Sequence, residues 1–289
     1  MATAFLGPRG TFSEEAAIRY AEGRDDLLAF GSIPALTSAV ETGLAAAAVL
    51  PIENSIEGSV SSTLDLLIHE TPLKIVSEVV VPIRHMLVTP AGSGLSDIKI
   101  VTSHPQALGQ CRRFLERCLP GAEQVAALST AGAVERVASD GDPTRAAIGP
   151  ARAAELYGGQ IIARDIQDIR GNLTRFVALA PEDAPPTGDD KTSLGLTLKA
   201  NVPGALFNVL QPFADEGIQM TKLESRPTKG WLGDYVFLID LEGHQTDAPV
   251  QRTVERALEQ AAMFKIFGSY PRFPIETLRD LVSSPALLP

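Results

Sequence analysis

The chain has 289 residues, enough for about two domains at the usual ~150 residues each. Hydrophobic residues make up 45% of it and charged residues 21%, an ordinary globular composition that excludes a largely disordered chain. The net charge of −10 argues against nucleic-acid binding, because phosphate contacts depend on clustered Lys and Arg. The same charge repels small anions at long range, so an anion site needs local cations or backbone N–H groups.

The apolar runs and the two cysteines indicate in which cellular compartment the protein is expected. No apolar run approaches the ~20 residues that span a bilayer, and the first residues do not resemble a secretory signal, so we expect no membrane contact. Cys111 and Cys118 are expected on one helix about 10 Å apart, which is too far for a disulfide. We therefore expect a reduced, cytoplasmic protein.

The first 180 residues alternate short apolar runs with helical patterns. This alternation predicts α/β layers with mostly parallel strands. Strands are expected at residues 46–50, 98–101 and 176–179, and helical spacing is clearest in Val60, Leu64, Leu67 and Ile68 and in Leu108, Cys111 and Leu115.

Residues 181–190, PEDAPPTGDD, have three prolines and four acidic residues and predict a linker. After it, strands are expected at 192–198, 218–224, 235–241 and 265–270, with one helix opened by Pro203 and ended by Gly217 and another around 250–258. The resulting order βαββαβ is that of the ferredoxin-like split unit.

Four polar turns in the first part are candidate sites. In GPRGTFS (7–13), Thr11 and Glu14 form a capping box, which is favoured over an anion-binding turn. In PIENS (51–55), Asn54 can orient a substrate oxygen or simply close a turn.

Of the other two turns, one follows the strand expected at 98–101 and one leads into the strand expected at 176–179. In SHPQA (103–107), Pro105 suits the first helical position, and His104 is more typical of a capping or surface histidine than of an acid–base catalyst. In GNLTRF (171–176), Thr174 and Arg175 are expected on opposite faces of a strand.

Together these fragments resemble the prephenate dehydratase family. The resemblance runs in order through GPRGTFS, PIENS, SHPQA, LTRF (173–176), GALFNVL (204–210) and ESRP (224–227), and covers nearly the whole chain. It implies a two-lobed, periplasmic-binding-protein-like catalytic domain at 1–181 with its site in the cleft, and a linker at 182–190. A ferredoxin-like ACT regulatory domain at 191–275 and a tail at 276–289 complete the implied organisation.

The implied reaction converts prephenate to phenylpyruvate with loss of water and carbon dioxide, a lyase reaction of phenylalanine biosynthesis without metal or organic cofactor. The resemblance makes Thr174 the group facing the leaving hydroxyl. A threonine hydroxyl is a poor acid, so a hydrogen bond to the leaving oxygen suits it better than proton donation. The implied catalytic residues are Thr174, Asn54, Ser103 and Gln106, and the implied substrate-binding residues are Thr11, Phe12, Ser13, Glu53, Ser55, Arg175 and Phe176.

The resemblance also implies an L-phenylalanine effector site at a homodimer interface of ACT domains, and such a dimer could pair into a tetramer. The effector would act as inhibitor or activator. The implied effector residues are Gly204, Ala205, Leu206 and Asn208 of one subunit, facing Glu224, Ser225, Arg226 and Pro227.

Two alternatives remain open. An arogenate dehydratase would act on the amino analogue of prephenate, and an additional carboxylate in the cleft would favour it. A non-catalytic amino-acid or small-molecule sensor on the same fold would have no need of Thr174 together with the Asn54 cluster.

Overall fold

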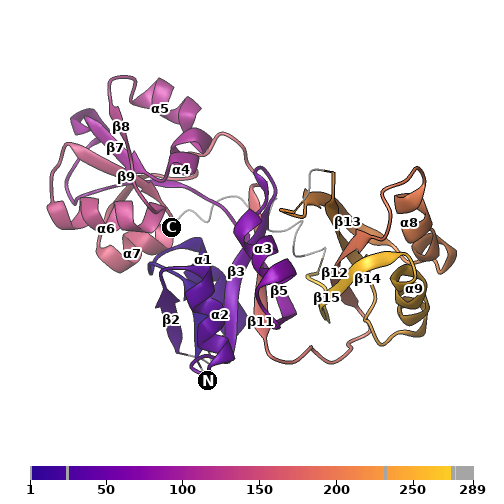
Figure 1. The fold of residues 1–289 in the computed structure, drawn as a ribbon. Coiled ribbons are helices and arrows are strands. Elements are labelled where there is room, and N and C mark those ends of the chain that lie inside the picture. The colour runs from indigo at the N-terminus through magenta and orange to yellow at the C-terminus, as the bar shows by residue number, and fades with distance from the viewer. Residues whose placement is uncertain (1, 24–25, 231–232, 275–276, 278–289) are drawn as a thin grey trace. The chain divides into compact units, whose positions relative to one another are not determined.

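The computed structural model describes residues 2–23, 26–230, 233–274 and 277. By contacts, the chain forms two compact units, and Figure 1 shows their elements. The first unit is built on Met1–Val60 and Val79–Phe176, and the second on Ser61–Glu78 and Val177–Phe273. Residues 181–189 carry no helix or strand. The domain boundaries at 181 and 191 stay predictions, and the tail at 276–289 lies outside the described residues except for Thr277.

The first sheet has strand order β2-β1-β3-β11-β5, with β4 paired to β3. Its strands are β1 (Thr3–Leu6), β2 (Leu27–Phe30), β3 (Ala47–Asn54), β4 (Gly58–Ser59), β5 (Lys74–Pro82) and β11 (Leu173–Ala180). Helices α1 (Phe12–Ala21) and α2 (Ile33–Glu41) connect its first strands, and α3 (Ser61–His69) follows β4. Because β3 and β11 are neighbours, the PIENS and LTRF fragments lie side by side.

The second sheet has strand order β10-β6-β9-β7-β8. Its elements are β6 (Met86–Thr89), the 3-10 helix η1 (Leu95–Asp97), β7 (Ile100–Ser103), α4 (Pro105–Gln110), α5 (Arg112–Cys118), β8 (Glu123–Ala126), α6 (Thr130–Asp140), β9 (Arg145–Gly149), α7 (Ala151–Tyr157) and β10 (Gln160–Ala163). Leu87 packs with α4 and α5, whereas Met86 and Val88 pack with α6 and α7, so strand alternation covers both faces of the sheet.

Two details correct the sequence predictions for this part. Both sheets are mixed, because β4 runs antiparallel to β3 in the first and β6 runs antiparallel to β9 and β10 in the second. The single helix expected through Leu108, Cys111 and Leu115 is two helices that meet at Cys111. The Asp168 carboxylate accepts hydrogen bonds from the backbone N–H of Arg113, 3.1 Å to each oxygen, and so caps the second helix.

Both cysteines are free, as expected. Cys111 is buried and Cys118 is exposed. No helix among the described residues has the length and apolar character needed to cross a membrane.

The third sheet is antiparallel, with order β13-β14-β12-β15. Its elements are β12 (Asp190–Leu198), α8 (Ala205–Asp215), β13 (Met220–Pro227), β14 (Tyr235–Glu242), α9 (Ala248–Leu258) and β15 (Ala261–Pro271). The order βαββαβ is therefore present, and Figure 1 shows α8 and α9 on one side of the sheet. Helix α8 begins at Ala205 rather than Pro203, because Gly204 adopts a left-handed conformation with φ of 84°.

Candidate functional site

The central polar pair of the first unit joins Asn54, at the end of β3, to Thr174 on β11. Asn54 Nδ2 donates to Thr174 Oγ1 over 2.9 Å, and both side chains are buried. Asn54 Oδ1 accepts from the backbone N–H groups of Ile56 and Glu57, each at 3.0 Å. Since those two donors fix the amide oxygen, the amide nitrogen must face Thr174.

A chain of amides extends from this pair. Asn54 Nδ2 also donates to Asn172 Oδ1 over 2.7 Å, and Asn172 Nδ2 donates to Gln110 Oε1 over 3.2 Å. Gln110 Oε1 lies 3.0 Å from Nε2 of the buried His85, and Gln110 Nε2 donates to Glu57 over 3.3 Å. Residues from β3, α4 and the segment before β11 thus form one hydrogen-bonded network.

A cavity of about 340 Å³ adjoins this network. Its lining includes Gln106, a residue proposed from sequence, together with Asn172, Gln110 and Glu57, and the apolar side chains of Ile56 and Ile169 also line it. This volume is at the small end of the ~300–1,000 Å³ typical of ligand pockets. The cavity therefore suits a small molecule held by amide groups.

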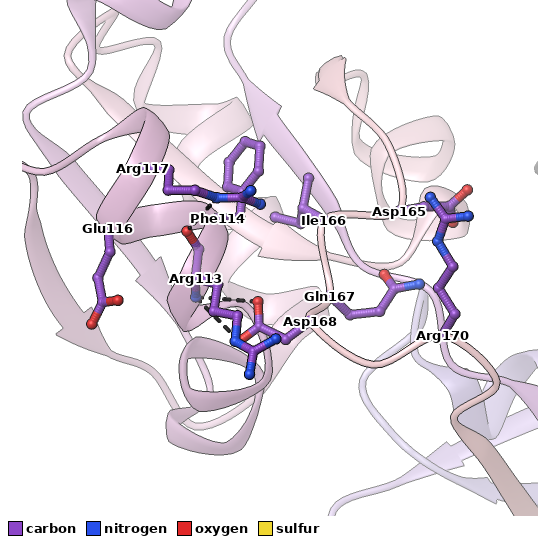
Figure 2. Close-up of a pocket in the computed structure, with 9 residues that line it drawn as sticks. All are labelled: Arg113, Phe114, Glu116, Arg117, Asp165, Ile166, Gln167, Asp168 and Arg170. Atoms are coloured by element: carbon purple, nitrogen blue, oxygen red, sulfur yellow. Dashed lines mark hydrogen bonds between the residues drawn. The ribbon is translucent and has the colours of Figure 1, made fainter.

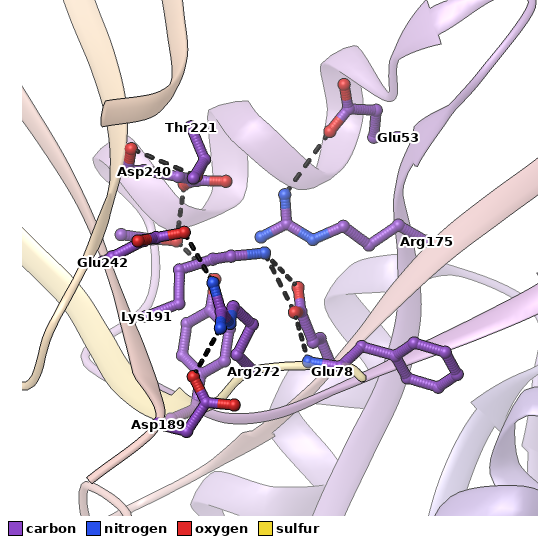
Figure 3. Close-up of polar contacts among 12 residues, drawn as sticks. Glu53, Glu78, Arg175, Asp189, Lys191, Thr221, Asp240, Glu242 and Arg272 are labelled. Atoms are coloured by element: carbon purple, nitrogen blue, oxygen red, sulfur yellow. Dashed lines mark hydrogen bonds and ion pairs between the residues drawn. The ribbon is translucent and has the colours of Figure 1, made fainter. Parts of the chain in front are cut away.

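Arg175 faces away from this network. Its Nη1 lies 3.4 Å from Glu53 Oε2, and Figure 3 shows the two side chains directed toward each other. Since Glu53 precedes Asn54 and Arg175 follows Thr174, strand alternation places the two pairs on opposite faces. The expectation that Thr174 and Arg175 point to opposite faces is confirmed.

The remaining predicted residues of this part have structural contacts. Ser55 Oγ accepts from Leu173 N over 3.0 Å, Phe176 is buried in β11, and Ser103 Oγ donates to Ile148 O over 2.6 Å. His104 caps α4, with its Nδ1 accepting from Gln106 N over 3.3 Å. The capping interpretation of His104 is therefore confirmed.

The GPRGTFS turn caps α1. Thr11 Oγ1 accepts from Glu14 N over 3.3 Å and donates to Pro8 O over 3.0 Å. Glu14 accepts from Gly10 N over 2.6 Å instead of completing the box at Thr11, and it pairs with Arg9 at 3.1 Å. Phe12 packs against His85 in an edge-to-face arrangement, with ring centroids 5.8 Å apart. No polar contact of Ser13 is found among the described residues.

A second cavity, of about 450 Å³, is rich in arginine, as Figure 2 shows. Arg113 and Arg117 of α5 and Arg170 line it, and so do three acidic residues, Glu116, Asp165 and Asp168. Phe114 and Ile166 add apolar surface. Gln167 and Asp168 line both cavities, so the two adjoin at the segment before β11. Among the described residues, no ion pair joins Arg113 or Arg170 to an acidic side chain.

The predicted effector residues lie in the second unit. Gly204 precedes α8, whose first residues include Ala205, Leu206 and Asn208. Glu224, Ser225, Arg226 and Pro227 end β13. Arg226 donates to Asp65 Oδ1 over 2.9 Å and to Ser61 Oγ over 3.2 Å, so this segment is bonded to α3.

Three of the titratable groups with shifted pKa values belong to the residues described above. Burial lowers the pKa of His85, and the opposing hydrogen bond to Gln110 is the smaller effect. Burial, with a smaller contribution from Asp168, raises the pKa of the Cys111 thiol to about 12. Burial alone would raise the pKa of Asp65, but hydrogen bonds from Lys229 and Arg226 outweigh it and hold that pKa below its usual value.

The sequence did not identify Asn172, Gln110, Glu57 or His85 as members of this network. Asn172 stands beside the LTRF fragment, and Gln110 lies four residues after Gln106, one turn along the same helix. Helical spacing could therefore have indicated Gln110. No group of three or more His, Cys, Asp and Glu side chains able to hold a metal ion is present in the described part of the chain.

Comparison with protein families and curated relatives points to one family. A family model described as prephenate dehydratase matches residues 3–184. A bifunctional chorismate mutase/prephenate dehydratase of Neisseria gonorrhoeae is 44% identical over 268 residues, covering 93% of this chain and 74% of the relative. A prephenate dehydratase of Corynebacterium glutamicum is 36% identical over 276 residues, covering 93% of this chain and 87% of the relative.

Two solved structures are similar over almost the whole chain. Prephenate dehydratase from Arthrobacter aurescens in complex with L-Phe matches with a TM-score of 0.86 and 36% identity, covering 94% of this chain and 90% of that one. GqqA, described as a novel type of quorum quenching acylase, matches with a TM-score of 0.85 and 33% identity, covering 96% and 100%.

Proposed function

The chain belongs to the prephenate dehydratase family, and from this premise we propose how its site performs the reaction and how the second unit regulates it. The activity is a decarboxylating dehydration: prephenate loses its ring carboxylate as carbon dioxide and its C4 hydroxyl as water, giving phenylpyruvate. Because the ring becomes aromatic, the site has mainly to orient the substrate and stabilise the leaving oxygen.

The hydrogen bond from Asn54 to Thr174 is the observation that carries the proposed mechanism. Thr174 Oγ1 accepts from Asn54 Nδ2, which leaves the hydrogen of the Thr174 hydroxyl available for a different acceptor. The Thr174 hydroxyl then donates this hydrogen to the C4 oxygen of the substrate as that oxygen departs. A donor whose own oxygen is already hydrogen-bonded is stronger and better aligned, because linked hydrogen bonds polarise one another.

The adjoining cavity supports substrate orientation by neutral donors. Gln106, Asn172 and Gln110 line it with side-chain amides, and hydrogen bonds fix the orientation of the last two. Neutral donors hold carboxylates without a second buried charge that would need its own partner. The proposed substrate-binding residues are Thr11, Phe12, Ser13, Glu53, Ser55, Arg175 and Phe176, and Ser103 stays a proposed catalytic residue beside Thr174, Asn54 and Gln106.

The test compares Thr174→Val, which keeps the shape, with Thr174→Ser, which keeps the hydroxyl. We expect the valine variant to lose about 10²–10³-fold in kcat for phenylpyruvate formation, the usual effect of removing one such donor. The serine variant should retain most of the activity. A valine variant with near-normal turnover contradicts the role of Thr174, and a wild-type chain that forms no phenylpyruvate contradicts the activity itself.

Two other activities are tested in the same preparation. The carboxylate of Glu53 is paired with Arg175 and so is not offered to the ammonium group of arogenate, which supports prephenate as the substrate. Measuring kcat/KM for prephenate and for arogenate tests this. Acyl-amide hydrolysis needs an activated nucleophile. Ser103 donates its hydrogen to a backbone carbonyl, and the Cys111 thiol has a pKa of about 12, so neither supports an acylase reaction.

Both free thiols support a reducing, cytoplasmic setting.

The βαββαβ module of the second unit is proposed as an ACT domain that binds L-phenylalanine between two copies of the chain. The relative solved with bound L-Phe supports this effector. The N–H groups opening α8 after Gly204 suit the effector carboxylate, and Glu224 suits its ammonium group. We assign the catalytic domain to 1–181, the linker to 182–190 and the ACT domain to 191–275.

The contact between Arg226 and Asp65 supports a route for regulation. Arg226 lies in the proposed effector segment, and Asp65 lies on α3, which follows the Asn54 loop in the chain. An effector that binds two states of the Arg226 segment with different affinity would change the position of α3. Titrating L-phenylalanine into the dehydratase assay tests this, with sedimentation reporting the oligomer; a wild-type rate unaffected by millimolar L-phenylalanine contradicts it.

A further inference from the structure

We propose that His85 is a positioning residue for this site: as an imidazole with its hydrogen on Nε2, it fixes the Gln110 amide and, through Asn172 and Asn54, the hydrogen bond to Thr174. This inference rests on the proposed dehydratase activity. It assigns a role to a buried histidine that the mechanism above does not use.

The orientation of the whole chain starts from two backbone N–H groups. Those of Ile56 and Glu57 fix Asn54 Oδ1 as the acceptor, so Asn54 Nδ2 is the donor to Asn172 Oδ1. Asn172 then has only its Nδ2 group left to donate to Gln110 Oε1. Each amide in turn inherits its orientation from its neighbour.

The same logic fixes the tautomer of His85. Gln110 Nε2 donates to the Glu57 carboxylate, which can only accept, so Gln110 Oε1 is the atom that faces His85. An amide oxygen cannot donate, and therefore His85 Nε2 must carry the hydrogen. Gln110 Oε1 thus accepts from both His85 and Asn172.

The surroundings hold the ring of His85 in place. Only 3% of the residue is exposed, its backbone N–H donates to Gln167 Oε1 over 2.9 Å, and its C=O accepts from Ile166 N over 3.0 Å. Phe12 packs edge-to-face against the ring. The backbone contacts come from the segment that lines the cavity, so the histidine joins that segment to the amide chain.

The second ring nitrogen argues against an acid–base role. His85 Nδ1 is buried without a hydrogen-bond partner among the described residues, so nothing there stabilises an additional proton. Burial accordingly lowers the pKa of His85. The ring is a fixed, neutral donor and not a source of protons for the leaving oxygen.

The experiment compares His85→Leu, which removes the donor, with His85→Gln, whose amide N–H can reach the same acceptor. We expect His85→Leu to lower kcat for prephenate by about 10–100-fold, the usual effect of losing a supporting hydrogen bond, with KM changed less than about threefold. His85→Gln should restore kcat to within about fivefold of wild type. His244→Leu is the matched control, because His244 is also buried, but in the second unit, and it should lower the melting temperature without this loss of kcat.

Several outcomes overturn the inference. A folded His85→Leu variant with kcat within twofold of wild type does so, and so does a His85→Gln variant as impaired as the leucine one. Nitrogen-15 NMR of wild-type His85 tests the tautomer even where a variant does not fold; an Nδ1-protonated ring or an imidazolium at pH 7 overturns the inference. Loss of dehydratase activity in the wild-type chain would instead contradict the proposed function, whatever the tautomer.

Discussion

The side-chain amide of Asn54 donates to the hydroxyl of Thr174 over 2.9 Å, although 120 positions separate the two residues in the chain. The contact exists because β3 and β11 are neighbours in the first sheet. It sets the direction of the Thr174 hydroxyl and with it the proposed chemistry.

The donor role of Asn54 is isolated by Asn54→Asp. Aspartate keeps an oxygen for the N–H groups of Ile56 and Glu57 but has no hydrogen to give Thr174 or Asn172. We expect kcat for prephenate to fall by about 10²-fold or more with a small change in melting temperature. Steady-state kinetics and thermal unfolding measure both. A variant that unfolds early, with no specific loss of kcat, would show that Asn54 serves only the turn.

The arginine-lined cavity of Figure 2 predicts a salt-dependent substrate capture. The chain carries a net charge of −10 and prephenate is a dianion, so removing one of the three arginines would leave the three carboxylates of this cavity in excess and repel the substrate. We expect Arg113→Gln to lower kcat/KM about two- to fivefold at low salt, with the difference shrinking above 0.1 M salt, where the Debye length is ~10 Å. The measurement is kcat/KM across a salt series.

Arg112→Gln is the matched control for that experiment. It removes the same charge from the neighbouring position of α5, where Arg112 pairs with Glu116 at 3.0 Å and does not line the cavity. Equal effects of the two variants would assign the salt dependence to total charge instead of to the cavity.

The ion pairs of Asp65 predict a pH-dependent contribution to stability. Arg226 and Lys229 hold the folded-state pKa of Asp65 below its usual 3.8. The stabilisation is therefore fully present above the unfolded-state pKa and is lost as the pH falls through the lower folded-state pKa. We expect Asp65→Asn to lower the melting temperature by about 2–4 °C at pH 7, the shift that ~1 kcal/mol produces in a chain of this size, and by less near pH 3.

Calorimetry of wild type and Asp65→Asn at both pH values checks this. A difference that grows toward pH 3 would have the wrong sign. Lys199→Gln is a suitable control, because Lys199 lies in the same unit but donates to a backbone carbonyl, with no carboxylate to titrate.

The Lys191–Glu78 pair in the second unit, shown in Figure 3, predicts a larger effect. Lys191 Nζ lies 2.9 Å from both Glu78 oxygens, and Glu78 also accepts from Phe273 N over 2.8 Å. Both side chains are largely removed from water. We expect Lys191→Met to reduce the free energy of unfolding by about 3–5 kcal/mol, because it removes the ammonium group that lies against both oxygens of a buried carboxylate.

Urea unfolding measures this change, and adding Glu78→Gln tests its cause. The amide still accepts from Phe273 N but carries no charge, so the double variant should recover part of the lost stability. A double variant as unstable as Lys191→Met alone would assign the loss to packing of the lysine stem.

Local patterns in the sequence were sufficient for the βαββαβ module, for several elements of the first part and for the family. Some features depend only on residues that are close in the chain and can be predicted without the tertiary structure. They are the apolar spacing of α3, the caps at Thr11 and His104, and the βαββαβ order. The six fragments likewise identified the family because their order and spacing are properties of the sequence itself.

The tertiary structure alone decided which of those residues meet. Strand pairing brings Asn54 to Thr174 and directs Arg175 to Glu53, and the Asp168 carboxylate caps the second of the two helices that meet at Cys111. Gln110, Asn172 and His85 join the site through hydrogen bonds whose direction is set by backbone N–H groups far away in the chain. A sequence lists donors and acceptors, but the protonation and orientation of each group follow only once every partner has its place in space.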